Sequence, residues 1–294
     1  MKRTILVGVL LALVAASLAA RGVQPPAPQG PKVVEVEKIK DNLYMLKGGG
    51  GNTAVYVGAN GVTVVDAKNP GWGQPILDKI KELTPKPVTL LINTHTHGDH
   101  VSGNVEFPAT VDIVVQENTK ANMEKMPIFK ESGGKGMPKR TFTDKMTIGG
   151  GKDRFDLYYF GRGHTNGDAF IVFPELRVMH AGDIFSGKNL PLLDYNNGGS
   201  GAEIGATLGK AHAGIKNVDQ IITGHSTVMT WNDLDEYAKF NDDFLRDVRA
   251  AMTAGKTADE VAASWKPADK YKGYNIQDAR LKTNVTAIYS ELKK

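Results

Sequence analysis

The sequence predicts an α/β fold in which two stacked sheets carry helices on their outer faces. Short apolar runs rich in β-branched residues alternate with segments of helical spacing, and the strands come in two batches. This interleaving is typical of layered α/β domains. The buried strand predicted at residues 88–92 is followed at 95–100 by HTHGDH. Three imidazoles and a carboxylate so close together indicate a metal site at a sheet edge.

The N-terminal residues 1–20 have the layout of a secretory signal. Lys2 and Arg3 precede an apolar stretch at 5–16, and small residues follow at 17–20. The stretch is short for a membrane span, so we expect a cleaved signal, no stable membrane anchor and a periplasmic or secreted protein. An uncleaved anchor is the alternative. The proline-rich residues 21–32 should form a spacer before a folded domain at 33–294.

Composition limits the kinds of partner. The chain has 36 basic and 32 acidic residues, a net charge of +4 and no cysteine. This balance argues against a nucleic-acid partner, so we expect a small-molecule substrate. The lack of cysteine excludes disulfides and argues against a structural zinc site, which cysteines usually close. Nothing in the sequence indicates the oligomeric state.

The first batch of secondary structure carries the histidine cluster. Its strands are predicted at 33–36, 43–46, 53–57, 62–66, 88–92 and 113–115. The glycines at 48–51 allow a flexible turn, and Asn60-Gly61 closes a hairpin. Helices are predicted at 74–83, before Pro85, and at 117–126. Residues 128–152 show no clear periodicity, which predicts a mobile loop.

The second batch leads into a helical tail. Strands are predicted at 155–160, 170–173, 178–181 and 218–222, with a helix at 202–213. From Trp231 the pattern is helical, with breaks near Gly255 and between Pro267 and Gly273. No change of composition marks a second domain. We therefore expect this extension, about 231–294, to pack on the same core.

Further metal-binding side chains follow predicted strands. His164, Asp183 and His225 each come shortly after a strand and lie close to glycine in the sequence. Glycine lets the chain turn sharply, and loops held by a rigid sheet commonly carry active sites. His95 and His97 are two residues apart, so they project to one side of an extended segment. Asp99 continues that phase and the next residue, His100, breaks it.

The order of these residues resembles the metallo-β-lactamase superfamily, from about Leu43 to His225. The resemblance implies an αββα sandwich of two mixed sheets, with a metal centre along one edge. It also implies two metal groups that share a carboxylate, as in branches similar to glyoxalase II. The first group is His95, His97 and His164, the second is Asp99, His100 and His225, and the bridge is Asp183.

Such a site predicts hydrolysis. Three ligands per metal plus a shared carboxylate leave room for solvent, which marks a catalytic site. We expect two Zn²⁺ ions, with iron or manganese as alternatives. A zinc-bound water has a pKa near ~7, against ~15.7 in bulk. A hydroxide bridging the ions would attack an ester, thioester, lactone or amide carbonyl, or less readily a phosphorus centre, and Asp99 would orient it as the catalytic residue.

Departures from the family pattern narrow the substrate. β-Lactamases similar to subclass B1 place cysteine where Asp183 stands, and those similar to subclass B3 place serine where Ile184 stands. Lactonases of the family carry tyrosine at the position of Ser186. The pattern thus favours ester, thioester or lactone hydrolysis, although not a homoserine-lactone substrate in particular. β-Lactamase activity, iron-dependent persulfide or oxygen chemistry, and metal binding without turnover are the alternatives.

Other polar residues carry weaker signals. Asp66 can orient a ligand imidazole or cap a loop. We expect His180 to be a packed strand histidine and His212 to be structural or exposed. Residues after Asp183 lie in a loop where relatives contact substrate, and an ordinary solvated loop is the alternative reading. These are Lys188, Tyr195, Asn196 and Asn197. Four methionines either line a soft apolar pocket or fill the core. They are Met123, Met126, Met137 and Met146.

Overall fold

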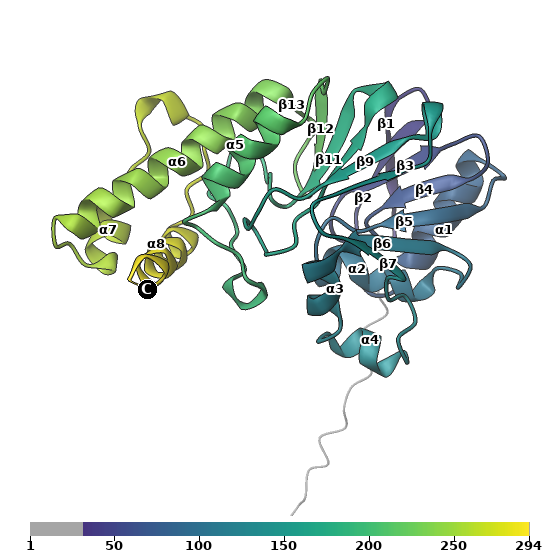
Figure 1. Ribbon diagram of the computed structural model, residues 1–294, viewed down its shortest axis with the longest axis horizontal. Helices are drawn as coiled ribbons and strands as arrows, with labels where there is room; N and C mark the ends of the chain where they lie inside the picture. The colour runs from purple at the N-terminus through teal and green to yellow at the C-terminus, as the bar shows by residue number, and fades with distance from the viewer. Residues whose placement is uncertain (1–31, 294) are drawn as a thin grey trace, which may run out of the picture. The chain divides into compact units, whose positions relative to one another are not determined.

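Residues 32–293 are described by a computed structural model of the chain. The predicted signal and nearly all of the proline-rich spacer lie outside these residues. Figure 1 shows two sheets that face each other, with helices on their outer sides. No helix within residues 32–293 is long and apolar enough to cross a membrane.

The first sheet has seven strands in chain order. They are β1 (Glu35–Lys40), β2 (Leu43–Lys47), β3 (Thr53–Val57), β4 (Val62–Val65), β5 (Val88–Ile92), β6 (Asp112–Gln116) and β7 (Arg140–Phe142). β1 to β4 are antiparallel, and β4 to β7 are parallel. The prediction placed the first strand at 33–36. β1 is a mostly exposed edge strand, so apolar alternation does not mark its ends.

Parallel pairing brings the cluster to the sheet edge. α1 (Gly73–Leu83) links β4 to β5, and α2 (Gly98–Val101) with the short 3-10 helix η1 (Ser102–Glu106) follows β5. Val65 pairs with Ile92 at the carboxyl ends of β4 and β5. The residues that follow these two strands therefore meet at one edge.

The second sheet has six strands in the order β13-β12-β11-β10-β9-β8. Their bounds are β8 (Lys145–Ile148), β9 (Phe155–Tyr158), β10 (Phe170–Phe173), β11 (Val178–Gly182), β12 (Gln220–Thr223) and β13 (Met229–Thr230). Only β11 and β12 are parallel, and α5 (Ile204–Gly214) lies between them in sequence. The sheet thus delivers the ends of two neighbouring strands to the same edge.

The prediction of a mobile loop at 128–152 is wrong. This stretch contains most of α4 (Pro127–Glu131), then β7, β8 and the 3-10 turn η2 (Gly151–Asp153). β8 has no buried residue, so its sequence lacks apolar alternation. The preceding helix also ends earlier than predicted: α3 is Glu117–Met123. Met126, directly before Pro127, has an extended backbone (φ −73°, ψ 132°), because a proline disfavours the helical conformation of the residue before it.

Alternating side chains build the layers. Val65, Ile92 and Ile171 point between the sheets, whereas their neighbours Val64 and Leu91 contact α1 on the outer face of the first sheet. Alternate residues of β10, β11 and β12 face away from the first sheet and pack under α5 and α6. This arrangement is the expected αββα sandwich.

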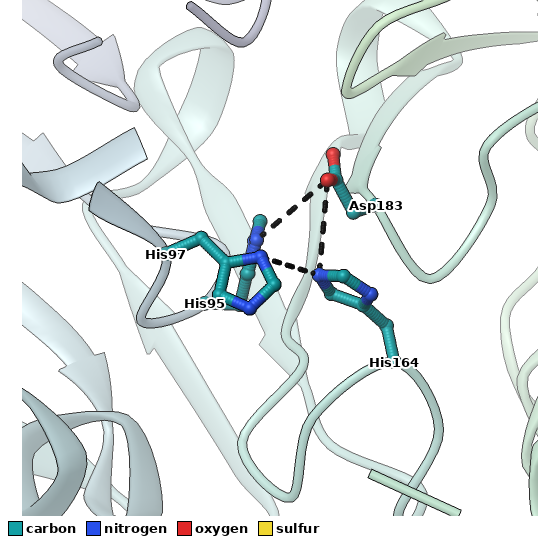
Figure 2. A group of neighbouring side chains, drawn as sticks. All are labelled: His95, His97, His164 and Asp183. Carbon is teal, nitrogen blue, oxygen red and sulfur yellow. Dashed lines mark hydrogen bonds and ion pairs between the residues drawn. The ribbon is translucent and has the colours of Figure 1, made fainter. Parts of the chain in front are cut away.

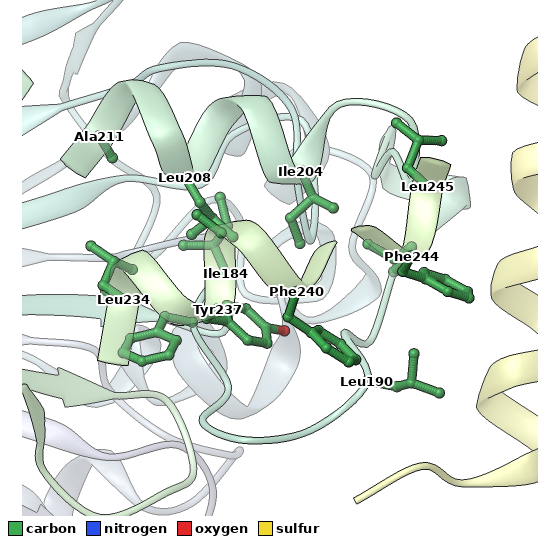
Figure 3. Packing of buried hydrophobic residues seen from close by; sticks show 14 of the residues in the cluster. Ile184, Leu190, Ile204, Leu208, Ala211, Leu234, Tyr237, Phe240, Phe244 and Leu245 are labelled. Carbon is green, nitrogen blue, oxygen red and sulfur yellow. The ribbon is translucent and has the colours of Figure 1, made fainter. Parts of the chain in front are cut away.

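The helical extension shares the core of the second sheet. It comprises α6 (Trp231–Thr253), α7 (Ala258–Ser264) and α8 (Asp278–Leu292). The predicted breaks, near Gly255 and between Pro267 and Gly273, are confirmed. Figure 3 shows side chains of α5 and α6 meeting in one cluster, including Leu208 and Phe240. The same cluster contains Ile288 of α8.

Candidate metal centre

The histidine motif lies where β5 turns into α2. His97 has extended backbone angles (φ −64°, ψ 145°) and caps the helix that begins at Gly98. His97 therefore has the extended backbone that was predicted, whereas His95 lies in a bend at residues 94–96. The prediction that Asp99 continues the extended phase is wrong, because Asp99 and His100 lie on a helical turn. The His100 ring nevertheless lies beside the His95 ring, with ring centroids 4.2 Å apart.

Four side chains form the first group: His95, His97, His164 and Asp183. Each offers a ligand atom, and these atoms lie within 4.8 Å of one another. Nε2 of His164 is 2.9 Å from Nδ1 of His97 and 3.7 Å from Oδ2 of Asp183. Figure 2 shows these side chains converging from separate loops. His164 comes from the loop after β9 and Asp183 from the end of β11.

The second group consists of Asp99, His100 and His225, whose ligand atoms also lie within 4.8 Å of one another. Nε2 of His225 is 3.1 Å from Oδ2 of Asp99. Asp183 reaches this group as well. Its Oδ1 is 3.2 Å from Nε2 of His100, and its Oδ2 is 3.3 Å from Nε2 of His225. One carboxylate thus lies between the two groups.

The donor atoms fit metal ions. Nε2 of His95 is buried and has no hydrogen-bond partner among the described residues. Buried polar atoms without a partner are rare in native interiors and costly. Imidazole nitrogens and carboxylate oxygens are the ligands that zinc, iron and manganese accept. Both groups can therefore each hold a metal, with Asp183 shared.

The groups differ in charge. Burial lowers the pKa of His95 and of His97, which keeps these imidazoles in the neutral form that binds metal. In the second group, hydrogen bonds to Asp183 and Asp99 raise the pKa of His225 to about 9. Burial raises the pKa of Asp183, but the nearby His100 outweighs it and holds this pKa well below its usual range. Asp183 is thus a carboxylate, the form that bridges cations.

Asp66 supports two ligands from behind. Its Oδ2 lies 2.7 Å from Nδ1 of His100. Thr94 donates to Asp66 through its backbone N–H and its hydroxyl, at 2.8 Å each. The Thr94 hydroxyl is also 2.9 Å from Nδ1 of His95. Asp66 therefore fills both roles considered from the sequence, orienting an imidazole and tying the loop after β5.

Two further supports were missed from the sequence. Oδ2 of Asp194 lies 2.8 Å from Nε2 of His97, and the Leu192 carbonyl lies 2.6 Å from Nδ1 of His164. Asp194 precedes Tyr-Asn-Asn-Gly and accepts from the backbone N–H of Asn196 and Asn197. That turn was readable from the sequence, but its histidine partner was not.

Lys68 is a second omission. This lysine is fully buried, and its ammonium donates to the carbonyls of Leu46 and Gly51 at 2.9 and 2.7 Å. Burial lowers its pKa to about 8. Gly51 in turn packs on His100: a Cβ there would lie 2.2 Å from the ring. Lys68 thus holds the glycine turn against a ligand.

The candidate substrate residues lie away from the ligands. Lys188 forms ion pairs with Asp233 and Glu236 of α6. The other three form the 3-10 turn η4 (Tyr195–Asn197), where the Asn196 side chain is exposed. None of the four makes a hydrogen bond or ion pair to a ligand side chain within residues 32–293. Asn197 does reach Asp194, at 2.6 Å, and so acts on His97 at one remove.

The remaining histidines and the methionines are structural. His180 is buried on β11, with Nε2 3.0 Å from the Asn52 carbonyl. His212 stacks on Trp231, with ring centroids 4.8 Å apart. Met123, Met126 and Met137 pack in a small core with Phe129. Met146 packs against the core between the sheets. Both histidine predictions are confirmed. Of the four methionines, Met123 is buried in the core and the other three are partly buried against it.

Comparison with known proteins agrees with this geometry. A family model described as the metallo-beta-lactamase superfamily matches residues 46–242, more than half of the chain. The chain belongs to the metallo-beta-lactamase superfamily. The match contains all seven side chains of the two groups.

Relatives within the superfamily carry different names. The chain is 26% identical over 212 residues to a type 2 metallo-beta-lactamase from Elizabethkingia meningoseptica, a match covering 68% of this chain and 80% of that protein. It is 28% identical over 164 residues to a hydroxyacylglutathione hydrolase from Nostoc punctiforme, covering 54% of each chain. The chain therefore spans about half the length of the second relative.

Solved metallo-beta-lactamase structures share the fold. A metallo-beta-lactamase from Pontibacter korlensis superimposes with a TM-score of 0.61 at 18% identity, covering 71% of this chain and 99% of that one. The inverting sec-alkylsulfatase Pisa1 from Pseudomonas sp. gives a TM-score of 0.72 at 15% identity, covering 88% of this chain and 50% of that one. These likenesses establish the αββα architecture.

Proposed function

We propose that this chain is a dinuclear zinc hydrolase that attacks the carbonyl carbon of a small ester, thioester, lactone or amide and breaks its acyl C–O, C–S or C–N bond. The observation that carries the proposal is the place of Asp183. Its carboxylate lies within 4 Å of imidazole nitrogens from both groups. A carboxylate so placed can bridge two ions, and two ions side by side favour hydrolysis.

The residues of the chain divide the work. When bound, the two ions supply an acidified water and a Lewis acid for the substrate carbonyl. His95, His164 and Asp183 are almost fully buried, whereas the side chains of Asp99 and His225 are 29% and 45% exposed. Substrate therefore approaches from the side of Asp99 and His225. There, Oδ2 of Asp99 can accept a hydrogen bond from the attacking water and orient it.

The relatives define two substrate classes to test first. One curated relative is named as a hydroxyacylglutathione hydrolase, whose name describes a thioester substrate. Another is named as a metallo-beta-lactamase, so β-lactam hydrolysis is the second candidate. Asp183 favours the first class, since β-lactamases similar to subclass B1 carry cysteine at that position.

The full chain loaded with zinc should be assayed against thioesters, lactones, aryl esters, phosphoesters and a chromogenic β-lactam. We expect hydrolysis in the carbonyl classes, lost by about 100-fold or more in Asp99→Asn, because a misoriented nucleophile costs that much. His212→Asn is the matched control, since His212 lies outside both groups, and should retain activity. Full activity in Asp99→Asn would contradict the proposal.

Metal analysis tests the redox alternative. Elemental analysis of the purified chain should find two zinc ions per chain, and no oxygen should be consumed with any persulfide. A single iron with oxygen consumption would replace the hydrolase proposal by the oxidoreductase one. Tight metal binding with no turnover of any substrate would leave a metal-binding protein.

A further inference from the structure

A loop at residues 190–199 separates the first group from the C-terminal helix α8. On its inner side, this loop accepts one hydrogen bond from each of two ligand imidazoles, those of His97 and His164. Asp194 lies 2.8 Å from Nε2 of His97, and the Leu192 carbonyl lies 2.6 Å from Nδ1 of His164. The backbone N–H of Asp194 also donates to the His164 carbonyl at 2.8 Å. The loop thus fixes the orientation of both imidazoles by hydrogen bonds.

The outer side of the loop is held by α8. Asn284, which is buried, donates to the Pro191 carbonyl at 2.9 Å. Arg280 donates to the Leu190 carbonyl at 2.9 Å. Pro191 directly precedes Leu192, so a single residue step joins the bond from α8 to the bond that holds His164.

The α8 helix is fastened again beyond the loop. Glu291 accepts from the backbone N–H of Gly201 at 3.0 Å and from the hydroxyl of Ser200. Ser200 in turn donates its backbone N–H to the Gly163 carbonyl, next to His164, at 2.8 Å. The helix therefore holds both flanks of the segment that positions His164.

Among residues 32–293, no hydrogen bond links α8 or the 190–199 loop to His100 or His225 of the second group. Its His100 is oriented by Asp66, at the end of β4 in the first sheet. In the first group, His95 is held by Thr94, which is bound to the same Asp66. The hydrogen bonds of α8 are thus connected, through the 190–199 loop, to His97 and His164 of the first group.

We propose that Asn284 and Arg280 of α8 are positioning residues that set the metal affinity of the first group and leave that of the second unchanged. Hydrogen bonds to the far nitrogen of a ligand imidazole fix the ring and raise its basicity. The α8 helix, which lies beyond the residues matched by the family model, is in this view a component of the metal centre. The inference rests on the proposed two-metal site.

Zinc dissociation constants of the full chain, measured by competition with a chromogenic chelator, test this inference. In a His225→Ala background, which disables the second group, Asn284→Ala and Asp194→Asn should each weaken zinc binding about 10- to 100-fold. In a His97→Ala background, the same changes should leave zinc binding unaltered. Arg280→Met repeats the test without opening a buried cavity.

Asn241→Ala is the matched control. Asn241 is equally buried but donates to Tyr237 within its own helix α6, so its removal should not change either affinity. Ring NMR of the zinc-loaded chain gives an independent readout: Asn284→Ala should shift the His164 ring signals and spare those of His100. Equal weakening in both backgrounds, or none in the first, would overturn the inference.

The same titration separates this inference from the proposed function. A wild-type chain that binds a single ion overturns the two-metal hydrolase, whatever the variants do. The positioning role of Asn284 is then tested on the affinity for that single ion. If Asn284→Ala leaves this affinity unchanged, the positioning role is rejected.

Discussion

Oδ2 of Asp66 lies 2.7 Å from Nδ1 of His100, and both side chains are fully buried. Asp66 directly follows β4 and His100 lies on α2, 34 positions further along the chain. We expect Asp66→Asn to lower the zinc affinity of the second group about 10- to 100-fold, because the amide lacks the charge that orients and activates the imidazole. Chelator competition measures this.

Asp156→Asn is the control for that change. Asp156 is also buried, but it binds Thr147 and Arg154 on the second sheet. Its zinc affinity should match that of the wild type. If Asp66→Asn also matched the wild type, Asp66 would have no role in holding the metal.

The glycine turn before β3 tolerates no side chain at Gly51. A Cβ there would lie 2.2 Å from the His100 ring, so the ring or the turn must move. We expect Gly51→Ala to lose the second zinc and to cost about 1–3 kcal/mol of stability through overpacking. Gly150→Ala, where a Cβ meets nothing within 4 Å, should change stability by less than about 0.5 kcal/mol. Equal behaviour of the two variants would contradict this prediction.

Removal of metal should lower the melting temperature. A ligand that binds only the folded chain stabilises it by about 2.7 kcal/mol at a concentration 100 times its dissociation constant. For a domain of this size, that corresponds to roughly 5–10 °C. Thermal denaturation with zinc and with a chelator measures the shift. A double variant, His97→Ala with His225→Ala, should show little difference between the two conditions, and a shift as large as that of the wild type would place the metal elsewhere.

Lys68 should make stability depend on pH. Its folded pKa is about 8 because of burial, below the ordinary lysine value of 10.5. Between these values the unfolded chain binds more protons than the folded chain, so the unfolding free energy rises with pH. Relative to Lys68→Met, the wild type should gain up to about 3 kcal/mol across this window. Urea unfolding of both metal-free chains at several pH values measures it, and a constant difference between them would disprove the titration.

The layer architecture was readable from the sequence because its signals are local. Val64-Val65 and Leu91-Ile92 sit in short apolar runs, and the helix at 73–83 has its apolar residues on one side. The stretch 128–152 was misread because it lacks such local signals. β7 and β8 are three and four residues long, and β8 buries none of its residues, so its pairing with β9 leaves no pattern in the sequence.

The seven ligand-type side chains were identified because imidazole and carboxylate recur beside glycine after strands. The residues that hydrogen-bond to these ligands were not identified. Asp194, for example, contacts His97 from 97 positions away, and no pattern near Asp194 in the sequence indicates that contact. Lys68 was not identified for the same reason. Its burial follows from the glycine turn folding over it.

The sequence by itself determined the fold class and the order of the candidate metal ligands along the chain, because hydrophobic period and residue chemistry are properties of short segments. The tertiary structure decided which buried groups orient those ligands and joined α8 to His164 through the 190–199 loop. Such contacts depend on how distant strands and helices pack, and packing is set by the whole core.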